Sequence, residues 1–136
     1  MDPARIAKIP LFAELDEGQR RHVAEIAGEL EVDAGTTIAH EGDFGYAMFA
    51  IEAGTADVRQ DGRLVRRLET GDVFGEIAIL ASGRRTADVV AASDMQLITV
   101  FNRDLWRLEG EVPELVSALR TMIAARLELP AGTQAP

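Results

Sequence analysis

Between residues 31 and 101 the chain consists of short apolar segments separated by glycines. The segments are rich in β-branched side chains, which is typical of strands. The turn between two of them, Gln60-Asp61-Gly62-Arg63, has the composition of a tight β-hairpin. This regular alternation of strand and turn predicts an antiparallel sandwich or barrel of about eight strands. The clearest expected strands are residues 36–38, 48–51, 56–58, 64–68, 86–90 and 97–101.

The segment before the strands has helical periodicity. Asp16 followed by Gln19 is a capping-box pattern, in which two side chains satisfy the first free N–H groups of a helix. Apolar residues then recur at helical spacing from Leu15 to Leu30. We therefore expect one N-terminal helix, from about residue 17 to residue 29.

Helical features return after the strands. Asn102 is placed to cap a helix that Gly110 interrupts, and Trp106 on this helix is expected to pack in the core against the barrel. Pro113 favours the first turn of a longer helix, which we expect to reach about Glu128. One stripe of that longer helix is apolar and consists of Leu115, Leu119, Met122 and Ile123.

Composition indicates a single globular domain over residues 1–136, with the barrel at about 31–101, C-terminal helices at about 102–129 and a tail at 130–136. The net charge of −9 disfavours nucleic acid and anionic membranes as partners. Cysteine is absent, which excludes disulfides and thiolate metal sites. No signal peptide and no membrane-spanning run is found, so we expect a cytoplasmic chain. The seven residues after the last expected helix leave no room for a DNA-reading helix-turn-helix.

The stretch from Gly71 to Asp88 carries the candidate chemistry. A turn at its start, a short helix over 75–81, a break at Gly83 and a strand from Arg85 are expected. Gly75 leaves space for backbone N–H groups to approach a phosphate. Glu76 can accept hydrogen bonds from sugar hydroxyls, and the fork of Arg85 can bind a phosphate through two parallel bonds. Each residue alone could be an ordinary surface acid or strand arginine, but their combination indicates an anionic sugar ligand.

Two adjacent motifs resemble the phosphate-binding cassette of the cyclic nucleotide-binding domain family. They are Phe74-Gly75-Glu76-Ile77-Ala78 and Arg84-Arg85-Thr86-Ala87. The family includes the catabolite activator protein, regulatory subunits of protein kinase A and cyclic nucleotide-gated channels. The sequence Gly-Arg-Arg-Thr-Ala resembles the channel branch in particular. The resemblance extends from about Ile9 to Leu129. It implies an eight-stranded antiparallel jelly-roll barrel, mainly β, with one N-terminal helix, a short cassette helix and two C-terminal helices.

The resemblance also implies residue roles. Glu76 would hold the ribose 2′-hydroxyl, Arg85 the cyclic phosphate, and the amides of Gly75, Ile77 and Ala87 the remaining oxygens, with Phe74 and Ala78 completing the motif. Two positions depart from the pattern: Arg84 stands where many members have proline, and Asp88 where a small hydroxyl residue is common. Strand alternation places Asp88 on the face opposite Ala87, away from the phosphate.

Four further residues have alternative interpretations. Thr86 is either a strand threonine or, as in similar domains, a partner of the guanine amino group, which would permit cGMP without excluding cAMP. Val58 could form an apolar wall under the base. Arg66 either points into the barrel near the base or reaches water at the strand edge. Arg126 falls within the apolar stripe of the last helix, where it either extends past the helix end or covers the purine as a lid.

These features favour a stand-alone regulatory module that binds cAMP or cGMP and signals to a separate protein partner by closing its C-terminal helix. The alternative is an interaction domain that keeps the fold without a ligand. An enzyme is not expected, because the sequence shows no paired nucleophile and base and no second acid near Glu76. His22 and His40 have no spaced acidic partner, so no metal site is expected either.

Overall fold

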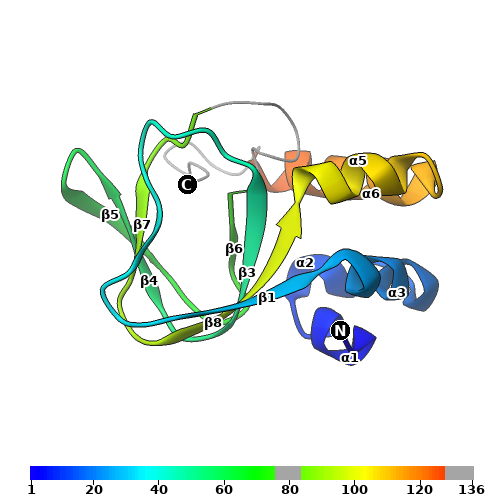
Figure 1. Cartoon of the computed structure of the whole chain (residues 1–136), viewed down its shortest axis with the longest axis horizontal. Helices are drawn as coiled ribbons and strands as arrows, with labels where there is room; N and C mark the ends of the chain where they lie inside the picture. The colour runs from blue at the N-terminus through cyan, green and yellow to red at the C-terminus, as the bar shows by residue number, and fades with distance from the viewer. Residues whose placement is uncertain (76–83, 128–136) are drawn as a thin grey trace.

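The computed structural model describes residues 1–75 and 84–127. Its strands form two four-stranded antiparallel sheets, with helices gathered beside one of them (Figure 1). The sheet next to the helices, called here the helix-side sheet, has the order β1-β8-β3-β6. Its strands are β1 (Gly28–Val32), β8 (Met95–Phe101), β3 (Ala47–Ala53) and β6 (Val73–Phe74).

The second sheet, called here the hairpin sheet, has the order β2-β7-β4-β5. Its strands are β2 (Thr37–Ala39), β7 (Asp88–Ala91), β4 (Ala56–Gln60) and β5 (Arg63–Leu68). The predicted two-layer antiparallel architecture is therefore present. A closed eight-stranded jelly-roll barrel is not confirmed, because the described strands pair within two separate sheets.

The central strands of the helix-side sheet, β3 and β8, are buried on both faces. Met48 and Ala50 of β3 belong to a core cluster shared with the helices, whereas Ile51 belongs to a second cluster between the two sheets. Ile98 and Leu97 of β8 divide between the clusters in the same way. Because both faces need apolar side chains, most residues of β3 and β8 are apolar.

The hairpin sheet is buried on one face only. Ala56 and Val58 of β4 lie in the cluster between the sheets, whereas Asp57 between them pairs with Arg67 on the outside, at 2.9 Å. This alternation is the pattern expected of a half-buried strand. The turn from β4 to β5 has positive φ at both Asp61 and Gly62, 51° and 77°, as a type I′ hairpin requires, so the predicted hairpin is confirmed.

Three N-terminal helices are present where one was expected. α1 (Pro3–Ala7) and α2 (Pro10–Ala13) each begin with a proline at a first helical position, a placement that the missing N–H of proline favours. α3 (Glu17–Ile26) has the predicted capping box of Asp16 and Gln19. It ends before the predicted residue 29, because the chain from Gly28 onward pairs with β8 as β1.

An arginine fixes the first helix to the sheet. Arg5 of α1 donates to both carboxylate oxygens of Glu52, at 2.9 and 2.6 Å, and also pairs with Glu29 of β1. The hydrogen bonds from Glu52 and Glu29 raise the pKa of Arg5. Helix α1 is thus held against two strands of the helix-side sheet.

Two C-terminal helices, α5 (Asn102–Glu109) and α6 (Pro113–Leu127), lie side by side in Figure 1. Asn102 does not cap α5 as predicted: the capping position is Phe101, the helix starts at Asn102, and the side-chain Oδ1 of Asn102 is buried without a partner among the described residues. The predicted apolar stripe of α6 is buried as far as Ile123 in the cluster shared by the helices. Within the described residues no helix is long and apolar enough to cross a bilayer.

Candidate functional site

The loop between β2 and β3 lies against the chain just before β7. The N–H of Gly42 donates to the carbonyl of Arg85 at 2.9 Å, and the N–H of Arg85 donates to the carbonyl of Asp43 at 2.6 Å. Phe44 forms an isolated antiparallel bridge with Arg84, whose guanidinium lies 4.5 Å from the centre of the Phe44 ring. Regular strand begins only at Asp88, three residues after the predicted start at Arg85.

The side chain of Arg85 lies over two glycines. Its Nη2 donates to the carbonyl of Ala47 at 2.8 Å, and its guanidinium lies 5.9 Å from the centre of the Phe49 ring. A Cβ atom on Gly45 would come within 3.0 Å of the guanidinium carbon, and one on Gly75 would also clash with it. Glycine at both positions therefore gives this arginine the room that it occupies.

Gly75 has a second reason to be glycine. Its φ is 78°, in the left-handed region that side chains disfavour. Gly75 is thus outside any right-handed helix, which corrects its predicted place as the first residue of the cassette helix. The rest of that predicted helix, including Glu76, Ile77 and Ala78, lies outside the described residues.

Asp88, a departure from the family pattern, is turned away from Arg85. Its Oδ1 accepts a hydrogen bond from the N–H of Glu41 at 2.6 Å. Ala87, the preceding residue, is buried in the cluster between the sheets together with Val58 and Phe74. The predicted alternation of Ala87 inward and Asp88 outward is confirmed. Thr86 is exposed, and its carbonyl accepts from Nε2 of Gln60 at 3.0 Å.

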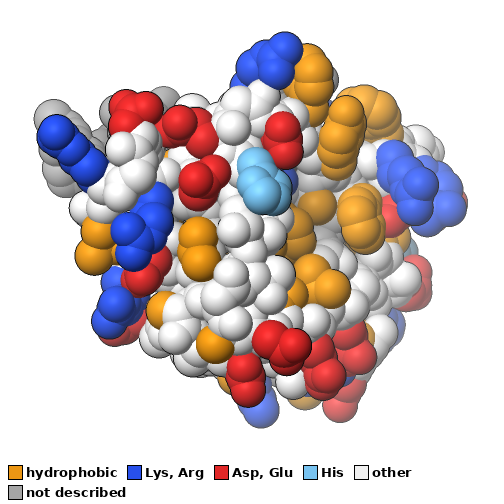
Figure 2. Space-filling model, turned by 60° about the vertical axis from the view of Figure 1, so that its left-hand side comes forward, with side chains coloured by type: hydrophobic (Ala, Val, Ile, Leu, Met, Phe, Trp, Pro, Cys, Tyr) orange, Lys and Arg blue, Asp and Glu red, His pale blue; other side chains and the backbone are white. Residues whose placement is uncertain are grey.

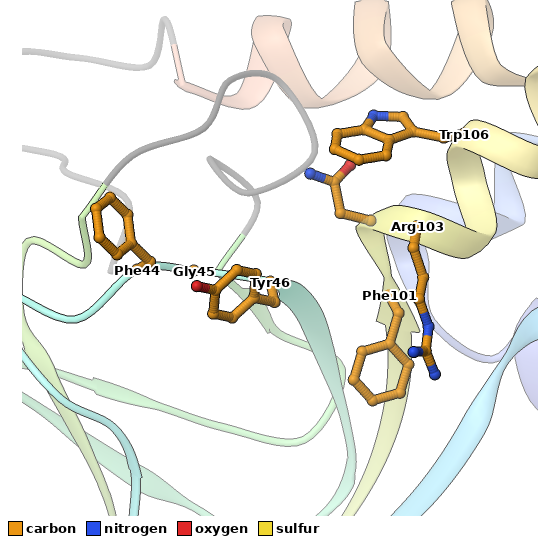
Figure 3. A pocket seen from close by; sticks show the side chains of 7 residues that line it. Phe44, Gly45, Tyr46, Phe101, Arg103 and Trp106 are labelled. Carbon is orange, nitrogen blue, oxygen red and sulfur yellow. The ribbon is translucent and has the colours of Figure 1, made fainter.

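A cavity of about 230 Å³ opens beside Arg85. Its lining includes Ala47, Phe49 and His40. An adjoining pocket of about 550 Å³ is lined by aromatic side chains from the β2–β3 loop and from the start of α5 (Figure 3). Both hollows share Phe44, Tyr46 and Phe101.

Trp106 does not pack in the core as predicted. It is 56% exposed and lines the larger pocket, whereas Leu105 and Leu108 supply the buried face of α5. Figure 3 shows Trp106 on α5 across the pocket from Tyr46. The sequence prediction assumed that the only tryptophan would be buried, but helical spacing places it between the two buried leucines and not on their face. The surface in Figure 2 mixes acidic and basic side chains, with hydrophobic ones gathered to one side.

The remaining candidate, Arg126, lies in the last turn of α6. The structure describes the backbone at this position and not the side chain. The lid role of Arg126 therefore stays a prediction, as do the ligand contacts of Phe74, Gly75, Arg85, Thr86, Ala87 and Val58.

The sequence can now be compared with known proteins. A model of the cyclic nucleotide-binding domain family matches residues 29–110, which contain the Arg85 site and both sheets. The chain belongs to this family. The resemblance inferred from the cassette motif is thereby confirmed.

Two curated relatives illustrate the similarity. The regulatory subunit of cAMP-dependent protein kinase from Aspergillus niger is 32% identical over 118 residues, which are 85% of this chain and 29% of that protein. The cGMP-dependent protein kinase of Caenorhabditis briggsae is 31% identical over 117 residues, 81% of this chain and 16% of that protein. The chain therefore spans less than a third of either relative.

Two solved structures of other proteins have a similar fold. The N-terminal domain of a transcriptional regulator from Streptomyces coelicolor A3(2) has a TM-score of 0.78 and 30% identity, covering 93% of this chain and 90% of that one. The catabolite activator protein of Thermus thermophilus has a TM-score of 0.73 and 28% identity, covering 87% of this chain and 58% of that one.

Proposed function

We propose that this cyclic nucleotide-binding domain binds a 3′,5′-cyclic nucleotide, with the cyclic phosphate on Arg85. The observation that carries this proposal is the position of the Arg85 guanidinium, which lies close against the backbones of Gly45 and Gly75. A guanidinium at this position can receive a phosphate through two charge-assisted hydrogen bonds. Gly75 next to it has positive φ and no side chain, so its backbone can approach the same anion closely.

The other ligand contacts follow the cassette motif. We assign the ribose 2′-hydroxyl to Glu76, and the remaining phosphate oxygens to the backbone amides of Gly75, Ile77 and Ala87. Phe74 and Ala78 would hold the cassette against the sheets. Val58 would pack under the base, because it lies in the cluster between the sheets with Ala87. Thr86, which is exposed beside that cluster, could reach the base from the phosphate side.

The chain would act as a regulatory, non-catalytic module that passes its signal to a separate protein partner through its C-terminal helix. Leu115, Leu119 and Ile123 of α6 are already buried among the helices, so closure of the whole helix over the ligand is not required. The part free to respond is the end of α6, where Arg126 lies. A purine would give this arginine a flat ring to stack against.

Calorimetric titration with cAMP and cGMP tests the binding proposal, with 5′-AMP as the control that lacks the cyclic phosphate. We expect micromolar or tighter binding of a cyclic nucleotide, and much weaker binding of 5′-AMP. Native-state binding stabilises the fold by about 2.7 kcal/mol at a hundredfold excess over Kd, so the melting temperature should rise. A melting temperature indifferent to millimolar cAMP and cGMP would refute the proposal and favour an interaction domain without a ligand.

Hydrogen exchange across residues 114–127 tests the proposed response of α6. Saturating nucleotide should slow exchange after Ile123 and leave the buried first turns unchanged, since a ligand shifts an equilibrium only through contacts that differ between the two states. Equal protection from exchange with and without nucleotide would mean that α6 does not respond to the ligand.

A further inference from the structure

Four exposed aromatic side chains surround the larger of the two hollows, called here the aromatic pocket. Phe44 and Tyr46 come from the β2–β3 loop, whereas Phe101 and Trp106 come from the end of β8 and from α5. They are between 40% and 69% exposed, and they are four of the seven exposed large hydrophobic residues in the described chain. Exposed apolar residues gathered in one place mark binding sites, whereas scattered ones do not. The volume of about 550 Å³ is in the range of small-molecule sites.

Backbone pairing fixes the two walls of the aromatic pocket relative to each other. The N–H of Asn102 donates to the carbonyl of Tyr46 at 2.9 Å, and Phe101 is paired with Ala47 across β8 and β3. Tyr46 and Trp106 are held on opposite sides of the space by these contacts (Figure 3). The pocket therefore exists before any ligand enters it.

The charges at the aromatic pocket are positive, although the chain has a net charge of −9. Arg103 belongs to the lining, and none of the described lining residues is acidic. A second guanidinium, that of Arg84, lies 4.5 Å from the centre of the Phe44 ring. In a chain with 23 acidic residues, this local arrangement favours an anionic ligand.

The guanidinium of Arg103 is available to such a ligand. It lies 5.6 Å from the centre of the Phe101 ring, and no carboxylate of the described residues pairs with it. Arg107 on the same helix differs, because it pairs with Asp104 at 2.9 Å and so neutralises the acid of the first turn. A guanidinium beside an aromatic ring keeps its N–H donors for a carboxylate, which it can bind through two parallel bonds.

The start of α5 adds to this preference for an anion. The capping position is Phe101, whose side chain makes no capping hydrogen bond to the first N–H groups of the helix. The beginning of a helix carries a partial positive charge. Because Asn102 and Arg103 of this first turn line the aromatic pocket, that charge lies in its wall.

We propose that the aromatic pocket binds a small aromatic carboxylate, with its ring between Tyr46 and Trp106 and its carboxylate on Arg103. Contacts between rings favour a planar ligand, and the guanidinium favours a carboxylate over a neutral or cationic group. The pocket is a second site, because Arg85 lines the smaller cavity and not the aromatic pocket. The inference does not depend on the proposed binding of a cyclic nucleotide.

Titration with three phenyl compounds of similar length tests the inference. They are the anion 3-phenylpropionate, the neutral 3-phenylpropionamide and the cation 3-phenylpropylamine. Trp106 is the only tryptophan of the chain, so its fluorescence reports binding in this pocket. We expect 3-phenylpropionate to bind with a Kd of about 1 mM, as its size allows. It should bind about 5- to 10-fold more tightly than the amide, the effect of a partly exposed charged hydrogen bond, and the amine should bind most weakly.

Matched variants locate the two parts of the contact. Arg103→Gln should reduce the affinity for 3-phenylpropionate to that for the amide. Arg107→Gln, the same change about one turn along α5, should keep the wild-type preference. Both arginines are exposed, so both variants should fold, which thermal unfolding checks. Tyr46→Ala should weaken the anion and the amide alike, by about 2- to 12-fold, the range of one contact between aromatic rings.

Arg85→Ala separates the aromatic pocket from the proposed phosphate site. This variant should bind 3-phenylpropionate as the wild type does, even where nucleotide binding is lost. Loss of 3-phenylpropionate binding would place the carboxylate at Arg85 and overturn the second site.

Three further results would overturn the proposal. One is equal affinity for the three compounds, which would indicate an apolar surface for a protein partner. Another is a preference for the anion that survives Arg103→Gln. The third is the absence of binding at ten times the expected Kd. Failure of cyclic nucleotides to bind would overturn the proposed function and leave this inference standing.

Discussion

The central strands of the helix-side sheet are buried on both faces, whereas the hairpin sheet is buried on one. Large side chains from the helices, among them Phe12, Leu105 and Leu115, cover the first sheet and join its residues in one cluster. The inner face of the hairpin sheet has mostly small residues, such as Ala56, Ala87 and Ala91. Two charged residues border the cluster between the sheets: Arg66 is paired with Val58 of β4, and the guanidinium of Arg85 lies over the Phe49 ring of β3.

This difference separates two tasks. Burial of large apolar side chains on both faces gives the helix-side sheet most of the hydrophobic stabilisation of the domain. Small side chains and half-buried arginines contribute less to stability, but they leave space and hydrogen-bond donors for an anionic ligand. Substitutions should therefore affect folding on one side of the molecule and binding on the other.

The largest expected effect is on the helix-side core. Phe12→Ala should lower the free energy of unfolding by about 3–5 kcal/mol, because Phe12 is 0% exposed and its loss leaves a cavity. Denaturant titration measures this change. Leu64→Ala in β5, where leucine is exposed, should change stability by no more than about 0.5 kcal/mol. Similar losses for both would contradict the division between the sheets.

The next effect concerns binding. Arg85→Ala should weaken cyclic nucleotide binding by about 2–5 kcal/mol, since the phosphate would lose a charged partner in a partly buried site. Arg84→Ala is the matched control, because Arg84 is exposed and contacts the Phe44 ring and the carbonyl of Gly42. Calorimetry on both variants measures the loss. A greater loss for Arg84→Ala would mean that the phosphate arginine has been assigned wrongly.

A smaller effect, on both folding and binding, is expected at Gly75. Gly75→Ala should destabilise the fold by about 1–2 kcal/mol, because its φ of 78° is left-handed. The new Cβ would also lie 2.8 Å from the carbonyl oxygen of Ala47 and would displace Arg85, so nucleotide affinity should fall as well. Gly62→Ala, at a φ of 77° with no atoms close to the new Cβ, should destabilise the fold similarly and leave affinity unchanged.

The smallest expected effect is a pH dependence of stability at the contact between α5 and α6. Arg120 of α6 donates to Glu109 of α5 at 2.7 Å, and this hydrogen bond lowers the pKa of Glu109. A lowered pKa in the folded state contributes stability above the ordinary pKa of the carboxyl, and this contribution disappears as pH falls through the lowered value. Glu109→Gln should therefore be slightly less stable than wild type at neutral pH and equal to it in acid, as followed by thermal unfolding. A difference that persists in acid would rule out ionisation as its cause.

The sequence predicted those features that depend on residues close together in the chain. The hairpin at Asp61-Gly62 and the capping box at Asp16 follow from residues a few positions apart, and both are present. The cassette motif predicted the family for the same reason, since its residues are contiguous. The inward position of Ala87 followed from simple strand alternation.

The errors occurred where distant pairing decides the structure. Two of the five residues of β1 are glutamates and the segment continues a helical pattern, so only its pairing with β8 makes it a strand. β6 has two residues, Val73 and Phe74, and is defined by pairing with β3. The close approach of Gly45 to Arg85 and the burial of the Arg66 Nε depend on contacts across the fold, which spacing along the chain does not reveal.

Ala47 connects the proposed phosphate site at Arg85 to the C-terminal helices. Its carbonyl accepts the hydrogen bond of Arg85, and its backbone is paired with Phe101, the residue immediately before α5. The neighbouring carbonyl of Tyr46 accepts from the N–H of Asn102, the first residue of that helix, at 2.9 Å. A phosphate that draws the Arg85 guanidinium away from Ala47 would thus change a contact one strand pair from the start of α5. If a nucleotide binds at Arg85 as proposed, coupling to α5 would need no long relay, because Arg85 and the first residue of α5 bond to the adjacent carbonyls of Ala47 and Tyr46.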